Sequence, residues 1–126
     1  FIDLVFKTED GKLHIMDYKT CSWGWGKQQK TDKMLAYQLV LYKHFFAQRY
    51  EIDPNDIEVH FCLLKRTAKK NVVEVFSITS GEKRTNNALD LMTRAIKTIK
   101  SKIHIKNKLA CTKGYGCEFY KTEHCK

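Results

Sequence analysis

The segment FIDLVFKTEDGKLHIMDYK, residues 1–19, decides the fold, because two apolar runs flank the turn Glu-Asp-Gly at residues 9–11. β-Branched and aromatic residues favour strands, and glycine supplies the positive φ that a tight turn needs, so the segment predicts a β-hairpin. A two-residue turn would put Asp3 and Asp17 on opposite faces of the hairpin. A three-residue loop with Gly11 left-handed would place them directly opposite each other, and we expect this loop or a compensating bulge.

Three charged side chains occur in these strands where an ordinary strand would bury valine or isoleucine. They are Asp3 in the first run and Asp17 and Lys19 at the end of the second. Alternate residues of a strand share a face, so Asp17 and Lys19 point to one side and Tyr18 to the other. The two carboxylates, with the backbone carbonyl of Tyr18, could bind Mg²⁺ or Mn²⁺, while Lys19 orients a water that attacks a phosphodiester. Solvated charges at a strand end are the alternative, because D-x-K is a short and common pattern.

The next periodic segment predicts a helix that begins at the capping pair Thr31-Asp32 and continues to about Arg49. This helix is apolar around much of its circumference, so we expect it to pack on the sheet. Gln38 and Tyr42 are four residues apart and share one face. A glutamine among apolar neighbours needs a hydrogen-bond partner. By itself such a Gln-Tyr pair is more often a structural contact than a site, but the neighbouring D-x-K motif favours a site.

The first third of the chain resembles the RecB-like branch of the PD-(D/E)XK nuclease superfamily. Asp3 matches motif II, D-Y-K-T from Asp17 matches motif III, and Y-Q-L-V-L-Y, which contains Gln38 and Tyr42, matches motif IV. The resemblance implies a restriction-endonuclease-like α/β core with a mixed central sheet flanked by helices. It also implies that Asp3 and Asp17 bind Mg²⁺ or Mn²⁺, that Lys19 helps to activate water, and that Gln38 and Tyr42 support the site and the DNA.

This resemblance further implies a metal-dependent exonuclease of recombination, repair or phage DNA processing, with DNA as its substrate and a helicase or recombination protein as a partner. The family's motif I, a Glu or His on a helix before the hairpin, has no counterpart in the sequence, and we expect an upstream portion to carry it. A different class of function keeps the fold without the chemistry: an inactive DNA-binding or scaffolding module of a larger helicase-nuclease.

Length and composition agree with one α/β domain, because 126 residues with 43% hydrophobic content can form a substantial core. The formal charge of +9 and the pI near 9.3 favour a polyanionic partner such as DNA. The sequence contains no apolar run of membrane-spanning length and no secretory leader. We therefore expect a cytoplasmic protein that binds no membrane, or one in the host cytoplasm if it is viral.

The segment Cys21–Lys30 has neither helical nor strand periodicity and is predicted to be a loop. Its Trp23 and Trp25 could stack on an unpaired base, and its Lys27 and Lys30 could follow the DNA backbone. The alternative is that one tryptophan packs against the domain and the lysines are solvated.

Two further strands are predicted at residues 57–65 and 72–78, and a second helix from Ser80 to about residue 103. In the first of these strands His60 has no partner apparent in the sequence and is interpreted as structural, and Cys62 as a small buried hydrophobe. The polar face of the second helix is basic and could lie along DNA, although such a face is usually only solvated; it carries Arg94, Lys97, Lys100 and Lys102.

The tail contains Cys111, Cys117 and Cys125 in a short glycine-bearing segment, a pattern that favours a metal over disulfides inside cells. It is similar to the end of the iron-sulfur members of the same nuclease branch, found among CRISPR adaptation nucleases and AddB-type helicase-nucleases. In those proteins three C-terminal cysteines and one cysteine before motif I hold a [4Fe-4S] cluster. The resemblance implies that an upstream portion carries this fourth ligand, for which Cys21 and His124 are less favoured substitutes. The alternatives are zinc bound by the three cysteines with His124, or free thiols in a disordered tail.

These predictions divide the chain into a nuclease core at residues 1–103 and a basic, cysteine-containing C-terminal extension at residues 104–126.

Overall fold

The computed structural model describes residues 1–103, 109, 111–112 and 116–123. The secondary-structure elements, in chain order, are β1 (Leu4–Lys7), β2 (Leu13–Cys21), α1 (Lys27–Lys30), α2 (Lys33–Tyr50), the 3-10 helix η1 (Pro54–Asp56), β3 (Ile57–Lys65), β4 (Val73–Ser77) and α3 (Glu82–Lys100). The chain forms two compact units, Phe1–Met92 and Thr93–Lys126, with the boundary inside α3. The first unit contains the sheet, α1, α2 and η1.

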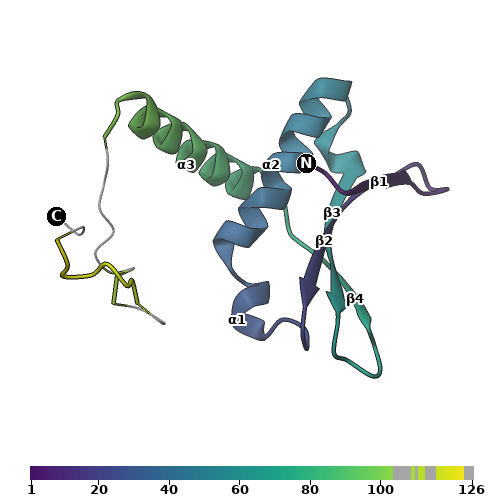
Figure 1. Cartoon of the computed structure of the whole chain (residues 1–126). Helices are drawn as coiled ribbons and strands as arrows, with labels where there is room; N and C mark the ends of the chain where they lie inside the picture. Colours follow the sequence, from purple (N-terminus) through teal and green to yellow (C-terminus); the bar gives the residue numbers. More distant parts are fainter. Residues whose placement is uncertain (104–108, 110, 113–115, 124–126) are drawn as a thin grey trace. The chain divides into compact units, whose positions relative to one another are not determined.

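The four strands form one mixed sheet in the order β1-β2-β3-β4 (Figure 1). The two central strands are parallel, and each outer strand is antiparallel to its neighbour. Parallel neighbours need a long crossover connection, and α2 lies in the connection from β2 to β3. The predicted α/β class, with a mixed sheet and flanking helices, is confirmed.

The hairpin has the three-residue loop that the sequence predicts. β1 pairs with β2 so that Val5 lies opposite Ile15. The two residues that flank the loop share a backbone hydrogen bond of 2.9 Å, and Gly11 within it has a φ of 88°. Extension of this register by two positions beyond Val5 places Asp3 across from Asp17, on the same face of the sheet.

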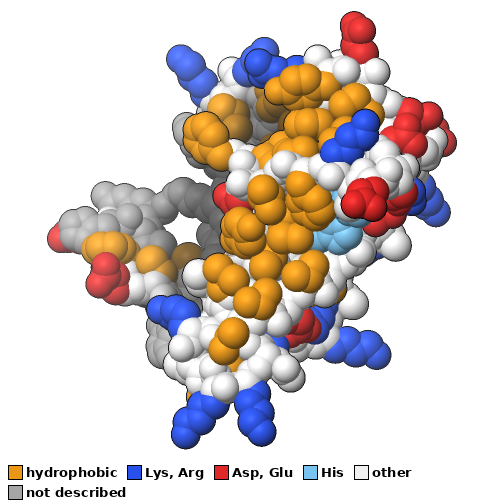
Figure 2. Space-filling view, turned by 90° about the vertical axis from the view of Figure 1, so that its right-hand side faces the viewer, with side chains coloured by type: hydrophobic (Ala, Val, Ile, Leu, Met, Phe, Trp, Pro, Cys, Tyr) orange, Lys and Arg blue, Asp and Glu red, His pale blue; other side chains and the backbone are white. Residues whose placement is uncertain are grey.

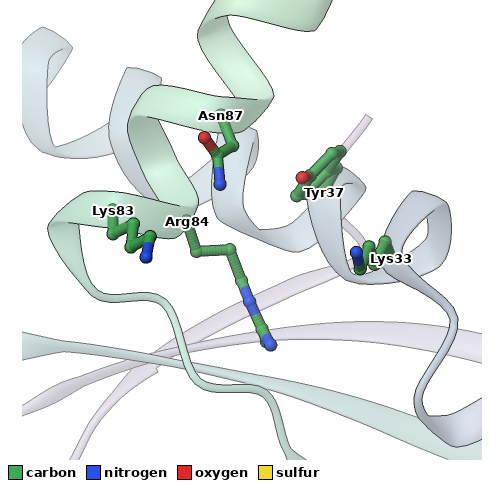
Figure 3. Close-up of a pocket in the computed structure, with 5 residues that line it drawn as sticks. All are labelled: Lys33, Tyr37, Lys83, Arg84 and Asn87. Atoms are coloured by element: carbon green, nitrogen blue, oxygen red, sulfur yellow. The ribbon is translucent and has the colours of Figure 1, made fainter.

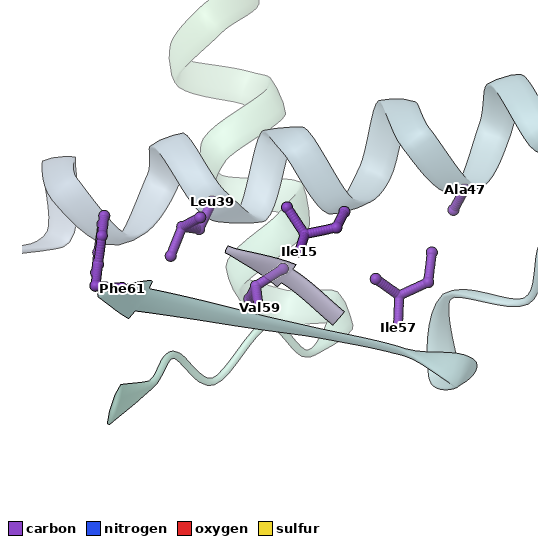
Figure 4. Close-up of a cluster of buried hydrophobic side chains, with 6 residues drawn as sticks. All are labelled: Ile15, Leu39, Ala47, Ile57, Val59 and Phe61. Atoms are coloured by element: carbon purple, nitrogen blue, oxygen red, sulfur yellow. The ribbon is translucent and has the colours of Figure 1, made fainter. Parts of the chain in front are cut away.

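The core lies between α2 and one face of the sheet, to which the odd-numbered residues of β2 and β3 point. Asp32 caps α2 as predicted, because its carboxylate accepts hydrogen bonds from two backbone N–H groups of the first turn at 2.7 and 3.2 Å. The central cluster of buried side chains, shown in Figure 4, consists of Ile15, Leu39, Ala47, Ile57, Val59 and Phe61.

The opposite face of the sheet carries the even-numbered residues of β2 and β3. This face combines apolar with polar side chains and is partly exposed: Tyr18 retains 42% of its surface and Leu64 37%. Figure 2 shows hydrophobic side chains gathered over this side of the molecule, with histidine among them. Cys62 lies on this face but is buried, as predicted, and burial raises the pKa of its thiol.

The segment Cys21–Lys30 differs from the predicted continuous loop. β2 continues to Cys21, and Lys27–Lys30 forms the short helix α1, held by a bond from the backbone N–H of Lys30 to the carbonyl of Gly26. Four residues are too few for a helical period to be visible in sequence. The strands predicted at residues 57–65 and 72–78 correspond to β3 and β4. The second helix is present but ends at Lys100. None of the helices in the described residues is both long and apolar enough to cross a membrane.

Candidate active site

Four of the predicted site residues form one polar network between β2 and α2. The amide Nε2 of Gln38 donates to Asp17 Oδ1 at 3.3 Å and to the hydroxyl of Tyr42 at 3.0 Å. The amide oxygen of Gln38 accepts from Lys19 Nζ at 3.1 Å, and the same ammonium lies 2.8 Å from Asp17 Oδ2. The carboxylate, the ammonium, the amide and the phenol are therefore held as a unit.

The local sequence explains this convergence. Asp17 and Lys19 are two residues apart in β2, so both point toward α2, where Asp17 is 3% exposed. Gln38 and Tyr42 are one helical turn apart on α2 and face the sheet together. Lys19 is less buried, with 28% of its side chain exposed, so its ammonium can reach both the buried carboxylate and solvent. The partner that Gln38 was predicted to need is thus the D-x-K pair.

Asp3 lies at the edge of this network, just before β1 begins. Its carboxylate is exposed, and its Oδ2 accepts the backbone N–H of Tyr18 at 2.8 Å. The N–H and C=O of one strand residue point to the same side, so the carbonyl of Tyr18 faces the same edge as Asp3. The Asp3 carboxylate therefore sits beside the peptide that joins Asp17 to Tyr18.

The donors of this network fit a divalent cation of the Mg²⁺ or Mn²⁺ type. Asp17 Oδ2 is buried and forms an ion pair of 2.8 Å with the Lys19 ammonium. Charged groups buried in a protein are either paired or bound to metals, because leaving water is costly for them. Carboxylate and carbonyl oxygens are the hard donors that these cations prefer, and Asp17, Asp3 and Tyr18 supply them.

The predicted stacking platform is only partly assembled. Trp23 is 77% exposed and Lys27 is exposed, so both remain accessible to a ligand. Trp25 instead packs on Phe61 of the core, with ring centroids 5.2 Å apart. Lys30 forms an ion pair with a glutamate of β4. Trp23 and Lys27 are therefore exposed, whereas Trp25 and Lys30 are engaged in contacts within the chain.

Two concave surfaces involve α2, and the first of them borders the network. One has a volume of about 510 Å³ and includes Asp3 and Tyr42 in its wall, together with aromatic residues and Arg49. The other, of about 250 Å³, lies between α2 and the start of α3 (Figure 3). Three of its five wall residues are cationic, which suits a phosphate group. The cationic residues are Lys33, Lys83 and Arg84, and the other two are Tyr37 and Asn87.

In the second unit, a backbone hydrogen bond of 3.1 Å from the Cys117 N–H to the Cys111 carbonyl holds these two cysteines in one turn. Gly116, which precedes Cys117, has a φ of 71°. Cys125 and His124 lie outside the described residues. The convergence of three sulfur atoms therefore stays a prediction.

A cluster that the sequence did not indicate lies on the face of the sheet opposite Asp17 and consists of His14, Glu58 and His60. Their ligand atoms all lie within 4.8 Å of one another. Only His60 attracted attention in the sequence, because the cluster depends on the parallel register that pairs His14 with Glu58. Glu58 and His60 are two residues apart in β3, but His14 comes from β2, so the sequence gives no local signal for the complete cluster.

The comparisons with known proteins agree with this geometry. The family model described as the PD-(D/E)XK nuclease superfamily matches residues 1–126. No curated protein and no solved structure matches the chain. Nucleases of this superfamily are hydrolases of nucleic acids that use divalent metals. With its mixed sheet, its flanking helices and a family match over its whole length, the chain belongs to the PD-(D/E)XK nuclease superfamily and has its restriction-endonuclease-like fold.

Proposed function

We propose that this chain is the core of a Mg²⁺- or Mn²⁺-dependent deoxyribonuclease of the RecB-like branch. The observation that carries the proposal is the buried Asp17 carboxylate, which is paired with the Lys19 ammonium at 2.8 Å and accepts a hydrogen bond from the Gln38 amide. The fold itself gains little stability from such a buried ion pair, because the cost of desolvating the two charges offsets their attraction. A catalytic metal site explains the arrangement directly.

Each residue has a distinct role in this proposal. Asp17, Asp3 and the carbonyl of Tyr18 would hold the cation, which polarises a phosphodiester and acidifies a bound water. Lys19, partly exposed, orients the attacking water. Gln38 fixes both the ammonium of Lys19 and the carboxylate of Asp17 through its single amide group.

The charge of the chain supports DNA as the substrate. A net charge of +9 favours binding to phosphates. Within the first unit, the basic cavity of Lys33, Lys83 and Arg84 can accept a backbone phosphate, and exposed Trp23 can stack on a base. We further propose that the enzyme is an exonuclease of recombination, repair or phage DNA processing in the cytoplasm. A helicase or recombination protein would be its partner.

A cleavage assay tests this proposal. Wild-type protein should degrade end-labelled linear DNA with Mg²⁺ or Mn²⁺ and leave covalently closed circles intact, and EDTA should stop the reaction. Lys19→Ala should reduce the rate by about 10²- to 10⁴-fold, the usual contribution of a proton-transfer or water-orienting group. The control is Lys7→Ala, which removes the same charge from an exposed position of β1 in the same hairpin.

Three outcomes decide between the hypotheses. Cleavage that Lys19→Ala leaves at the wild-type rate would refute the site. Cleavage of closed circles would refute exonuclease specificity while leaving the site intact. Tight DNA binding with no cleavage in either metal would support the alternative of an inactive DNA-binding module.

The iron-sulfur proposal concerns the second unit alone. We propose that Cys111 and Cys117, already joined through their backbone, hold a [4Fe-4S] cluster together with Cys125. Anaerobically purified protein should then be brown, and Cys117→Ser should remove the colour. Colourless protein with stoichiometric zinc that is lost in Cys117→Ser would support the zinc alternative instead.

A further inference from the structure

The cluster on the face of the sheet opposite Asp17 has the geometry of a transition-metal site. His14 Nδ1 lies 2.9 Å from His60 Nε2, and each of these nitrogens lies 3.9 Å from Glu58 Oε2. A triangle with sides of 2.9, 3.9 and 3.9 Å has a centre about 2.1 Å from each corner. Zinc binds histidine nitrogen and carboxylate oxygen at roughly 2.0–2.2 Å, so a single ion could contact all three atoms with little movement.

The outer ring nitrogens of both histidines are held by hydroxyl groups. Thr8 Oγ1 lies 3.2 Å from His14 Nε2, and Ser77 Oγ lies 3.1 Å from His60 Nδ1. Histidines that bind metals usually donate the second ring N–H to such a partner, which fixes the tautomer and directs the other nitrogen at the ion. If both hydroxyls accept, the two inner nitrogens face each other with lone pairs, an arrangement that requires a cation or a shared proton between them.

Burial and charge also suit a bound ion. The side chains of His14 and His60 are 15% and 11% exposed, whereas that of Glu58 is 41% exposed, so the carboxylate opens the cluster to solvent. Burial, aided by His14, lowers the pKa of His60 and favours the neutral imidazole that binds metals. Glu58 Oε1 pairs with Lys12 at 3.0 Å, which leaves Oε2 directed at the histidines.

We propose that His14, Glu58 and His60 form a binding site for a borderline divalent transition metal, Zn²⁺ above all, separate from the nuclease centre. Two imidazoles and one carboxylate select such ions over Mg²⁺, which prefers oxygen ligands alone. The three ligands leave a fourth position for water. Bound zinc would tie β2 to β3, and through Thr8 and Ser77 also the hairpin loop and β4. The proposal does not depend on the nuclease assignment, because no residue is shared.

Zinc titration of the purified full chain tests the site. Calorimetry with Zn²⁺ in excess Mg²⁺ should show one more zinc bound per chain in the wild type than in His60→Gln or His14→Gln. The control is His44→Gln, which removes a histidine of α2 outside the cluster and should keep the wild-type stoichiometry. Zinc held by the cysteine tail would remain in all four proteins, so the difference in stoichiometry reports the cluster alone.

Equal stoichiometry in the wild type, His60→Gln and His14→Gln would overturn the proposal and leave a shared proton between the rings as the explanation. A measurement on the wild type guards against misfolded variants. Zn²⁺ should shift the ring nitrogen resonances of two histidines in NMR spectra, and anomalous scattering at the zinc edge should place an ion between β2 and β3. Unshifted ring resonances, or zinc found only at the tail, would overturn the proposal.

Discussion

Asp17→Asn is the most direct perturbation of the candidate active site. It exchanges one carboxylate oxygen for an amide group, removes the negative charge and leaves the side-chain volume almost unchanged. The proposed function requires this carboxylate as a metal ligand. Loss of a residue that merely supports a ligand costs about 10- to 100-fold. Loss of the ligand itself should therefore reduce metal-dependent cleavage by at least about 100-fold, or about 2.7 kcal/mol of transition-state stabilisation.

The same substitution should change stability much less than activity. It relieves the desolvation of a carboxylate that is 3% exposed and removes the ion pair with Lys19 at 2.8 Å. These two effects oppose each other. The remaining ammonium is 28% exposed and keeps part of its hydration. We therefore expect the free energy of unfolding to change by less than about 2 kcal/mol, below the roughly 3–5 kcal/mol typical of a fully buried charge left without its partner.

Cleavage activity and stability are measured separately. Activity is the initial rate of nucleotide release in saturating Mn²⁺, and stability is the urea unfolding midpoint without metal. Asp56→Asn is the matched control, since Asp56 is exposed and lies in η1, immediately before β3, far along the sheet from Asp17. Cleavage by Asp17→Asn within about threefold of the wild-type rate would refute the site assignment. A loss of more than about 4 kcal/mol of stability would refute the electrostatic argument.

Three further predictions concern the surroundings of the site. Tyr42→Phe removes the acceptor of the 3.0 Å hydrogen bond from Gln38. It should lower the free energy of unfolding in urea by about 1 kcal/mol and the cleavage rate by about 10-fold, and an unchanged rate would exclude a positioning role. Gly11→Ala should lower the free energy of unfolding by about 1–2 kcal/mol more than Gly81→Ala does. An added Cβ meets no atom at either position, but only Gly11 has a left-handed φ, so equal thermal stability of the two variants would contradict this. Hydrogen bonds from two lysines lower the pKa of Glu74, so its contribution to stability is present above about pH 4.5 and is lost as the pH falls further. Glu74→Gln should therefore lower stability by up to about 1 kcal/mol at pH 7 and by progressively less as the pH falls below about 4.5, and a loss that does not diminish in acid would point to packing instead.

The parts of the fold that the sequence predicts are those fixed by neighbours along the chain. The spacing of Gly11 from the two apolar runs determines the loop length, and the loop length determines that Asp3 faces Asp17. Asp32 caps α2 through its own first turn. Gln38 was identifiable because an amide on an apolar helix face must find a partner, and the structure supplies Asp17 and Lys19.

The parts that the sequence left open or did not predict depend on contacts between distant segments. Trp25 could have faced solvent, but it packs on Phe61 of β3. Lys30 could have been solvated, but Glu74 of β4 pairs with it and places α1 over the sheet. In both cases the partner lies more than thirty residues away, so no local period or cap could indicate it.

The two metal-binding candidates follow from one property of the sheet, the alternation of side chains along β2. His14 and Asp17 lie three residues apart in the same strand and therefore point to opposite faces. The face toward α2 presents carboxylate oxygens, with the Tyr18 carbonyl beside Asp3, and these donors suit Mg²⁺ or Mn²⁺. The other face presents two imidazoles, which suit Zn²⁺. Because a slip of β1 by one residue would move Asp3 from the first face to the second, the left-handed Gly11 keeps the oxygen donors of the face toward α2 together and apart from the histidines.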